Sequence, residues 1–498
     1  MNVLLLSMPD SFEHMPTVAV RMPNGGLASI AGNVDPHHKV AIADLILVQK
    51  TVRATLERLV REIKPDVVGL SIMTFQRKTA LQIIELVRSL SPGVRIVVGG
   101  YDPSLATAAY MKEGSGVDFV VCGEGDVTFR ELLRALEGGK NDFASINGLV
   151  WRDGDTWQRN LPRRVHTLEG DEIRLPNRGA RVLDGYAMMG RQVDVIETSR
   201  GCTFDCSFCS IIEMRGRNFH TYSFDRVIAD IADAKAHGAR TIFIIDDNIT
   251  LNIERFEAFC HAIIEAGHND IDYTIQAMTS AIANHGDKLA PLMRKAGFRY
   301  VFLGIENIVE DNLDFLVASA KNRLRKNGRR IGNASLRAIE AIRQNGMYVV
   351  GGLIVGNPND TLDSVRANLQ FARKYVDWPY IQHPTPYPGT PMTKDFRERN
   401  LIKNENLEQY DGTTAVVASE HLEPEEIEYE RWRAERWMKV RHLPPMVAHD
   451  PWFVLRNWWG MLSFTFRGSS VKSVLGLESD REVFARYRAI RSAERQYL

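Results

Sequence analysis

The sequence is poor in cysteine and has no long apolar run. Its 498 residues hold five cysteines, three of them in one short loop, which is too few for a disulfide framework. No stretch reaches the roughly 20 uninterrupted apolar residues that a membrane-spanning helix needs. Residues 1–7 lack the basic start and cleavage site of a secretory signal, so we expect a cytoplasmic protein. The 62 basic residues equal the 62 acidic ones, and this balance predicts no nucleic-acid partner.

Three of the cysteines, Cys202, Cys206 and Cys209, have the spacing CxxxCxxC and directly follow an apolar run at 193–198. Thiolates are the usual ligands of iron-sulfur clusters, and a four-iron cluster with three cysteine ligands keeps one iron open. The alternative is a structural zinc site, which normally has four ligands, often as two close pairs. His220 is the only nearby candidate for a fourth ligand, and the paired layout is missing. We therefore favour an iron-sulfur cluster.

The first part of the chain alternates short apolar runs with helical periodicity. Strands are expected at 3–6, 67–71, 96–99 and 119–121, and helices at about 51–63, 78–90, 104–113 and 126–137. This alternation predicts a parallel sheet with right-handed crossovers, in a doubly wound, flavodoxin-like α/β domain. Ligands of such domains bind at the carboxyl ends of the strands. Neither GxGxxG nor GxxxxGK[ST] occurs, which disfavours a nucleotide but leaves flavin or no ligand open.

A hairpin is expected at 148–157, because Asp153-Gly154 favours a two-residue turn, and a polar linker follows at about 159–190. The alternation then resumes. Strands are expected near 193–198, 241–245, 271–276, 299–304, 348–355 and 380–385, with helices near 223–237, 254–266, 286–296, 333–345 and 361–376. Six such repeats with a cysteine loop after the first strand predict a partial (β/α)6 barrel, whose chemistry gathers at the strand carboxyl ends.

Four motifs together resemble the cobalamin-binding radical S-adenosylmethionine (SAM) proteins. They are the cysteine loop, Gly123 to Gly125, Phe243 to Asn248 and Tyr387 to Pro391. The resemblance implies a cobalamin-binding domain at 1–145, a hairpin and linker at 146–190, a radical SAM barrel at 191–400 and a mainly helical substrate-specificity region at 401–498. It also implies three cofactors: a 4Fe-4S cluster on the three cysteines, SAM on the open iron, and cobalamin.

The chain departs from the cobalamin-binding motif DxHxxG, whose histidine ligates cobalt. His37 and His38 follow Pro36 without that motif, so we expect both on the surface. The resemblance then implies base-off cobalamin with no histidine on the cobalt, and Phe75 is a candidate for covering the lower face.

The resemblance assigns further candidate residues at strand ends. Those expected around cobalamin are Ser71, Thr74, Gly99, Gly100, Gly123 and Glu124. Those expected around SAM are Phe208, against the adenine, and Gln276, Glu306 and Asn357. Each of them is also a common turn or helix-cap residue. Asp246 and Asp247 are expected to anchor a loop, and Cys122 and Cys260 to be buried small side chains.

The function that this resemblance implies is radical methyl transfer to an unactivated carbon of a hydrophobic or natural-product substrate. Oxidative ring formation is the alternative within the same family, and cobalamin binding without catalysis is a second alternative. The expected partners are a small hydrophobic substrate and a reductant such as flavodoxin or ferredoxin.

The last hundred residues combine charged and aromatic stretches. Residues 425–443 form a charged helical run with Trp432 and Trp437, and an aromatic-rich segment follows at 451–466. Basic and aromatic residues interleaved in this way can lie in a membrane interface, which would place the protein at the inner membrane face. The interpretation that we favour is a terminal helix packed on the barrel, because aromatic side chains are mostly buried.

Overall fold

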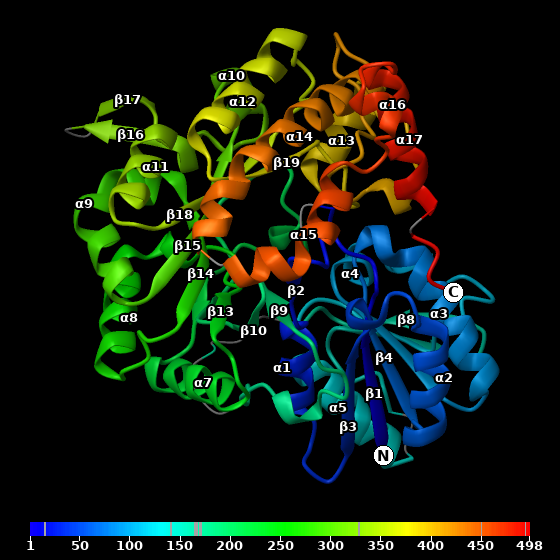
Figure 1. Cartoon of the computed structure of the whole chain (residues 1–498). Helices are drawn as coiled ribbons and strands as arrows, with labels where there is room; N and C mark the ends of the chain where they lie inside the picture. Colours follow the sequence, from blue (N-terminus) through cyan, green and yellow to red (C-terminus); the bar gives the residue numbers. More distant parts are fainter. Residues whose placement is uncertain are drawn as a thin grey trace.

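The computed structural model describes residues 1–13, 16–139, 142–163, 168, 172–326, 329–449, 451–493 and 495–498. It contains two large sheets that lie side by side, with the C-terminal helices against both (Figure 1). Part of the expected linker, at 164–167 and 169–171, falls outside the described residues. In the part of the chain that is described, no helix is both long and apolar enough to cross a bilayer.

The first sheet has the strand order β3-β1-β4-β5-β6-β7-β8. Its strands are β1 (Asn2–Ser7), β3 (Lys39–Asp44), β4 (Val67–Ser71), β5 (Arg95–Gly99), β6 (Phe119–Val121), β7 (Leu149–Asp153) and β8 (Thr156–Arg159). The five strands from β3 to β6 are parallel, and their central residues are apolar and buried, as is usual for a sheet covered on both faces. The antiparallel hairpin β7–β8 extends this sheet at β6, so the predicted hairpin is confirmed.

Helices cover both faces of the first sheet. Apolar residues of α2 (Val52–Ile63) and α3 (Arg77–Leu90) share one buried cluster with the strands. Residues of α1 (Gly25–Asn33) and α5 (Gly125–Glu137) belong to a second cluster with the other face. This is the predicted doubly wound α/β domain.

One predicted helix of this domain is wrong. The segment 104–113 contains only the end of the short helix α4 (Tyr101–Leu105) and the 3-10 turn η3 (Thr107–Ala109). The backbone leaves the helical region at Ala106 because the chain bends around the buried Asp102 carboxylate, which accepts hydrogen bonds from the Arg77 guanidinium and the Tyr110 hydroxyl.

The second sheet has the order β19-β18-β15-β14-β13-β10-β9-β2. Its parallel strands are β10 (Arg191–Ile196), β13 (Thr241–Ile244), β14 (Asp272–Met278), β15 (Phe298–Glu306), β18 (Tyr348–Ile354) and β19 (Trp378–Gln382). The short antiparallel strands β9 (Ala187–Met188) and β2 (Val20–Arg21) complete one edge. All six predicted strands are therefore present, and they form the predicted half-barrel.

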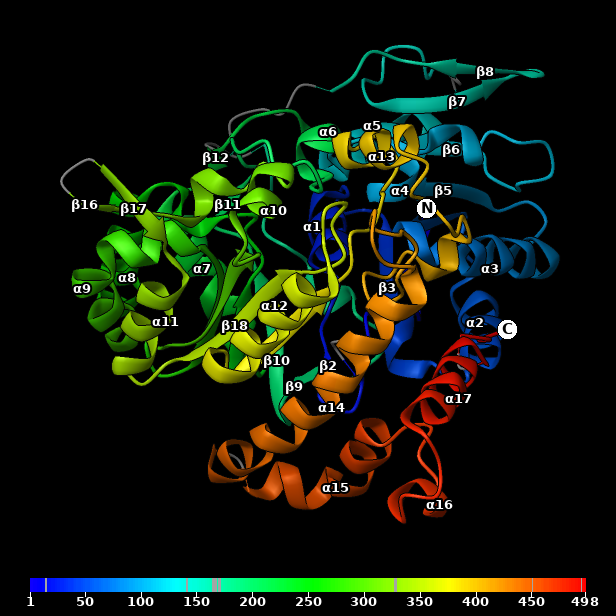
Figure 2. The ribbon, with the colours of Figure 1, turned by 90° about the horizontal axis from the view of Figure 1, so that it is seen from above.

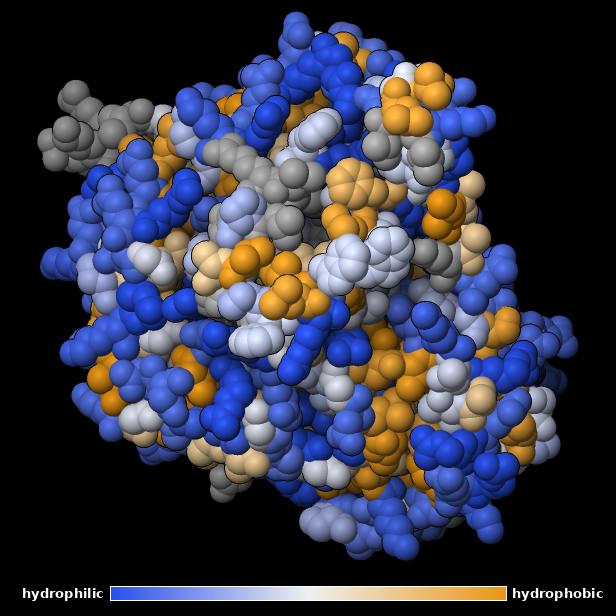
Figure 3. All heavy atoms as spheres, in the orientation of Figure 1, coloured by the Kyte–Doolittle hydropathy of each residue, from blue (hydrophilic) through white to orange (hydrophobic). Residues whose placement is uncertain are grey.

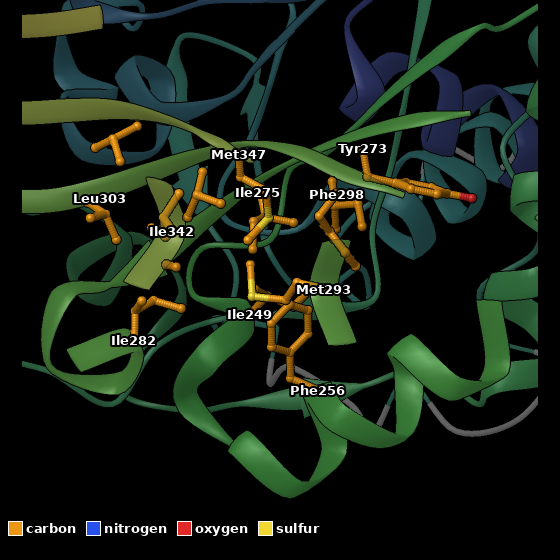
Figure 4. Close-up of a cluster of buried hydrophobic side chains, with 14 of the residues drawn as sticks. Ile249, Phe256, Tyr273, Ile275, Ile282, Met293, Phe298, Leu303, Ile342 and Met347 are labelled. Atoms are coloured by element: carbon orange, nitrogen blue, oxygen red, sulfur yellow. The ribbon is translucent and has the colours of Figure 1, made fainter. Parts of the chain in front are cut away.

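Five helices pack on the outer face of the half-barrel. They are α7 (Phe224–Ala236), α8 (Ile253–Glu265), α9 (Thr279–Lys295), α11 (Ser335–Gln344) and α12 (Leu362–Tyr375). Figure 4 shows how side chains of the strands, such as Ile275 and Phe298, meet Phe256 of α8 and Met293 of α9 in this core. The helices therefore cover the outer face of the half-barrel sheet, and its inner, concave face is left to form a binding site.

The C-terminal region is helical, as predicted. Its helices are α13 (Pro391–Glu398), α14 (Pro424–His449), α15 (Pro451–Thr465), α16 (Val471–Val474) and α17 (Asp480–Ala493). Figure 2 shows α14 running past α12 and the half-barrel, while α17 leads back to the first domain. Arg491 of α17 pairs with Glu13 at 2.9 Å, and Leu498 packs against the core of the first sheet. The C-terminal region therefore joins the two halves of the molecule.

Candidate active site

The three cysteines of the CxxxCxxC motif lie in the loop between β11 (Ser199–Arg200) and α6 (Ile211–Arg215). Cys202 and Cys206 are buried and Cys209 is half-buried. The backbone N–H of Cys209 donates to the Cys206 carbonyl at 3.1 Å. The loop directly follows the first strand of the half-barrel, where the motif predicted it.

Two neighbouring carboxylates hold this loop in place. Asp246 accepts hydrogen bonds from the Thr198 N–H at 2.6 Å and the Ser199 hydroxyl at 2.6 Å, and Asp247 accepts from the Gly201 N–H at 2.9 Å. Gly201 has φ +91°, and a Cβ atom there would meet Asn218, so only glycine fits this turn. The prediction that these two aspartates anchor a loop is confirmed.

The cysteine loop fits a four-iron cluster better than a single zinc ion. Tetrahedral zinc–thiolate bonds of about 2.3 Å bring the sulfur atoms to roughly 4 Å of one another. Among the described residues, the only three potential ligands within 4.8 Å of one another are His37, His38 and Glu137, so the cysteine sulfurs are more widely spaced. Burial also raises the pKa of the Cys209 thiol to about 12, and a bound metal is what would hold it as a thiolate.

A cavity of about 460 Å³ occupies the concave face of the half-barrel. One end is formed by the cysteine loop together with Glu306 and Lys321. The middle and the far end are largely apolar. Near the amino ends of the strands, far from the cysteine loop, the lining residues are Tyr300, Trp378, Val20, Met22, Met188 and Met189, while Phe302 and Tyr380 lie further toward the carboxyl ends. This long cavity, called the barrel cavity here, has polar chemistry at one end and space for an apolar molecule at the other.

An acidic and a basic side chain, Glu306 and Lys321, line the polar end of the barrel cavity, close enough for each to shift the pKa of the other. Glu306 has φ +59°, a strained conformation for a non-glycine residue, beside the irregular pairing of β15 with β18. Burial raises its pKa to about 7, although Lys321 opposes this. Burial alone would lower the pKa of Lys321, but Cys206 and Glu306 raise it overall. A carboxyl group and an ammonium group so close to the cysteines suit the amino and carboxylate groups of an amino acid.

Three of the four residues expected around SAM line the barrel cavity: Phe208, Gln276 and Glu306. Asn357 does not. Its side chain is fully buried, and its amide donates to the Ile354 carbonyl at 3.1 Å, inside a turn that is also held by the Asp360 carboxylate. The prediction for Asn357 is therefore wrong, because its side chain is used in the turn that follows β18 and does not line the barrel cavity.

A second cavity, of about 320 Å³, lies at the carboxyl ends of the strands of the first sheet. It is called the interdomain cavity here, because the second domain supplies its opposite wall. The predicted residues on its wall are Ser71, Gly99, Gly100, Gly123 and Glu124. Facing them are Arg200, Met214 and Arg215, and Asp247 lines both cavities. The two cavities are thus neighbours.

Two polar atoms in the interdomain cavity have no hydrogen-bond partner. Glu124 Oε1 and Arg215 Nε are both buried and lie 3.8 Å apart. Buried polar atoms of proteins are nearly always hydrogen-bonded, so an ion pair of two such atoms that lies beyond hydrogen-bond distance beside a cavity leaves both free to bind a polar ligand. The amide-bearing rim of a corrin offers both donors and acceptors. The residues present therefore fit cobalamin.

Two residues expected around cobalamin lie elsewhere. Thr74 and Phe75 are buried in the 3-10 turn η2 (Thr74–Gln76) and do not line the interdomain cavity. The Phe75 ring packs against Phe12, with ring centroids 4.9 Å apart, because the chain turns inward directly after Met73. Met73 itself lines the cavity. Phe75 is therefore no longer a candidate for covering cobalt.

The expectation for the two histidines is half wrong. His37 is exposed, but His38 is buried, with its Nδ1 3.0 Å from the amino group of Met1. Both directly precede β3 and so lie at the amino ends of the strands, whereas the interdomain cavity lies at the carboxyl ends. Neither histidine lines that cavity.

Sequence reasoning missed several residues of the two cavities. Lys321 lies in the 3-10 turn η6 (Ser319–Asn322), which contains no recognisable motif. Folding of the chain brings it to the cysteines, which are more than 100 residues earlier in the sequence. Arg215 stands six residues after Cys209 and was visible as a basic residue beside the motif. Of the other two cysteines, Cys260 is fully buried as expected, while Cys122 is half-buried.

Known families match both halves of the chain. Residues 15–133 match the B12 binding domain, and residues 196–372 match the Radical SAM superfamily. The chain belongs to the B12-binding radical SAM proteins. Cobalamin, SAM and a 4Fe-4S cluster are therefore its cofactors, and it is a radical SAM enzyme.

Relatives of this B12-binding radical SAM enzyme align over most of its length. It is 29% identical to an uncharacterized methyltransferase of Pyrococcus horikoshii, over 86% of this chain and 90% of the relative. It is 25% identical to the anaerobic magnesium-protoporphyrin IX monomethyl ester cyclase of Rubrivivax gelatinosus, over 81% of this chain and 73% of the cyclase. The solved structure of the radical SAM methyltransferase TsrM from Kitasatospora setae shares the fold, with 19% identity, a TM-score of 0.63 and coverage of 80% and 75% of the two chains.

Proposed function

We propose that this enzyme transfers a methyl group to an unactivated carbon of a small hydrophobic substrate. The observation that carries this proposal is the adjacency of the two cavities, which share Asp247 as a wall residue. When bound, the three cofactors supply one-electron cleavage of SAM and a methyl group carried on cobalt. A substrate in the barrel cavity would lie next to both.

The protein's own contribution is binding and orientation. We assign Glu306 to the amino group and Lys321 to the carboxylate of the SAM methionine portion, because both side chains line the barrel cavity together with the cysteine loop. Phe208 is suited to contact the adenine. The rings of Phe243 and Phe302 would bind the apolar substrate and exclude water, which protects a reactive carbon radical from side reactions.

Oxidative ring formation is the second candidate function. It is favoured by the 25% identity to the protoporphyrin ester cyclase, which extends over most of both chains. A non-catalytic cobalamin carrier is disfavoured, because it would give no role to the buried cysteine loop and the acidic and basic side chains beside it.

The proposal includes two partners. The cluster needs a one-electron reductant, and we propose a flavodoxin or ferredoxin of the cytoplasm. We also propose peripheral contact with the inner membrane face through the C-terminal region, where several aromatic side chains of α15 are exposed.

The proposal is tested by anaerobic incubation of reconstituted protein with SAM, a reductant and fractionated lipid extracts, followed by mass spectrometry. We expect 5′-deoxyadenosine and one product heavier than its precursor by CH2, because a methyl group replaces the hydrogen atom that deoxyadenosine carries away. Matched variants are Glu306→Gln, which should weaken SAM binding, and Glu310→Gln, an exposed residue at the start of α10 (Glu310–Phe315) that should behave as wild type. No deoxyadenosine with any fraction would contradict the proposal of an enzyme, and a dehydrogenated cyclic product would favour the second candidate.

A further inference from the structure

Helix α15 packs against the chain segments around the short strands β2 and β9. Its inner side chains Phe453, Val454 and Met461 belong to one apolar cluster with residues of these strands. The contact is close: a Cβ atom at Gly190 would lie 2.7 Å from Phe453, and one at Gly460 would lie 3.1 Å from Val18. The helix is thus seated on the edge of the half-barrel (Figure 2).

The strand residues under α15 are also the wall of the barrel cavity. Residues that belong to both the apolar cluster and the cavity lining are Val20, Met22, Met188, Met189 and Trp378. A single layer of side chains therefore separates α15 from the apolar far end of the barrel cavity. Three of these side chains are methionines, which change conformation easily and pack against ligands of varied shape.

The outer side of α15 is apolar and exposed. Trp452 and Trp459 are each 69% exposed, and Leu455, Trp458 and Leu462 are exposed as well. Figure 3 shows this side of the molecule, where α15 crosses the front. Large side chains exposed together on one helix usually mark an interaction surface. Tryptophan in particular is enriched where protein meets the membrane–water interface.

The charge of the same segment has one sign. Residues 451–477 contain Arg456, Arg467 and Lys472 and no aspartate or glutamate. Exposed leucines, Leu475 and Leu477, follow α15. Basic side chains beside exposed tryptophan and leucine are complementary to an anionic lipid surface. With 15 residues, α15 is too short to cross a bilayer and suited to lie in its interface.

We propose that α15 lies in the headgroup region of an anionic bilayer, and that the barrel cavity takes its substrate from that bilayer through the wall formed by β2 and β9. The substrate class is a membrane-resident lipid whose apolar body fills the far end of the cavity while its reacting carbon reaches the cysteine end. The substrate part of this inference rests on the proposed function; the membrane part does not.

The first test is cosedimentation of the full-length protein with vesicles. We expect binding to phosphatidylglycerol–phosphatidylcholine vesicles, weaker binding to pure phosphatidylcholine, and weakening by salt. The double variant Trp458→Glu/Trp459→Glu should bind at least about tenfold more weakly. The matched control is Leu161→Glu, at a 76% exposed leucine in the segment after β8, which should bind as wild type. Unchanged far-ultraviolet circular dichroism checks that both variants fold.

Equal vesicle binding by the double variant and wild type would overturn the proposal. Absence of vesicle binding by the wild-type protein would also overturn it. A third contradicting result would be a wild-type dimer in light scattering that the double variant converts to a monomer, because α15 would then contact a second copy of the chain.

The second test follows a fluorescent rigid lipid, dehydroergosterol, from vesicles into the protein. Wild type should take it up, and Val350→Trp, which fills the barrel cavity, should not, although it still binds vesicles. Trp458→Glu/Trp459→Glu should accept the probe from detergent micelles but lose uptake from vesicles. No uptake by wild type, or equal uptake by all three proteins, would overturn loading from the bilayer. Methyl transfer to a detergent-dissolved substrate without vesicle binding would refute this inference alone, whereas vesicle binding without SAM cleavage would refute the proposed function alone.

Discussion

The Arg200 guanidinium, in the segment that leads into the cysteine loop, donates to the Asp126 carboxylate at 2.7 Å, in the first turn of α5. The two residues belong to different domains and are both buried. Burial would lower the pKa of Arg200, but Asp126 and Glu197 raise it well above its usual value. Burial would likewise raise the pKa of Asp126, and Arg200 lowers it overall. This pair links the two domains at the wall of the interdomain cavity, which both residues line.

Removing the charge of Asp126 should loosen this wall. Asp126→Asn leaves a buried guanidinium with Glu197 at 2.8 Å and Glu124 at 3.6 Å as its remaining carboxylate partners, so we expect a loss of about 2 kcal/mol in the free energy of unfolding. Urea unfolding of the apoprotein measures it. Glu62→Gln is the control, because Glu62 pairs with Arg58 in an exposed helix pair and should cost less than about 0.5 kcal/mol. Equal effects of the two variants would contradict the role of the buried pair.

A second prediction concerns the dependence of stability on pH. Burial raises the pKa of Asp10 to about 7, and its Oδ2 has no hydrogen-bond partner. The folded protein therefore binds one more proton than the unfolded chain between pH 4 and 7, and this contribution to stability is lost as pH rises through 7. Asp10→Asn should stabilise the protein at pH 8, by about 4 kcal/mol at most, and little at pH 4. Thermal melts at both pH values measure this, and a gain of equal size at both would contradict it.

The cysteines should differ in their effect on iron content. Anaerobically reconstituted protein is expected to hold about four irons and four sulfides, and replacing Cys202, Cys206 and Cys209 together by alanine should remove them. Cys122→Ala and Cys260→Ala are the matched controls, because these cysteines lie outside the loop. Iron and sulfide analysis with electron paramagnetic resonance decides the matter. A single zinc with no cluster would contradict the assignment.

Cobalamin should bind without a histidine on cobalt. His37 and His38 lie before β3, and the residues of the interdomain cavity lie at the opposite ends of the neighbouring strands. The Co(II) form should therefore show no nitrogen superhyperfine splitting in its electron paramagnetic resonance spectrum. A splitting that disappears in His38→Gln would contradict this prediction.

Much of the fold follows from local patterns in the sequence. The strands β1 and β4 are apolar runs, and the helices α2 and α3 carry an apolar stripe at helical spacing, so both kinds of element were predictable. Helix α1 was not predicted, because Gly25 and Gly26 and its small residues give a weak helical signal.

The candidate site was predictable where a motif marks it and unpredictable where the fold brings residues together. The spacing of the cysteines marked the cluster loop. Lys321 reaches that loop from a turn without any motif, and this contact depends on packing of distant segments. The predictions for Asn357 and Phe75 were wrong because position near a strand end was taken to mean that the side chain lines a cavity. Each stands near a strand end, but a local turn points its side chain away from both cavities.

The central claim is that the substrate receives a methyl group that originates in SAM. The most direct measurement uses SAM labelled on its methyl group, the reconstituted holoenzyme, a reductant and the true substrate. Each turnover should yield 5′-deoxyadenosine and S-adenosylhomocysteine together, and the label should appear in the product. Deoxyadenosine without labelled product and with little S-adenosylhomocysteine would contradict methyl transfer and indicate ring formation.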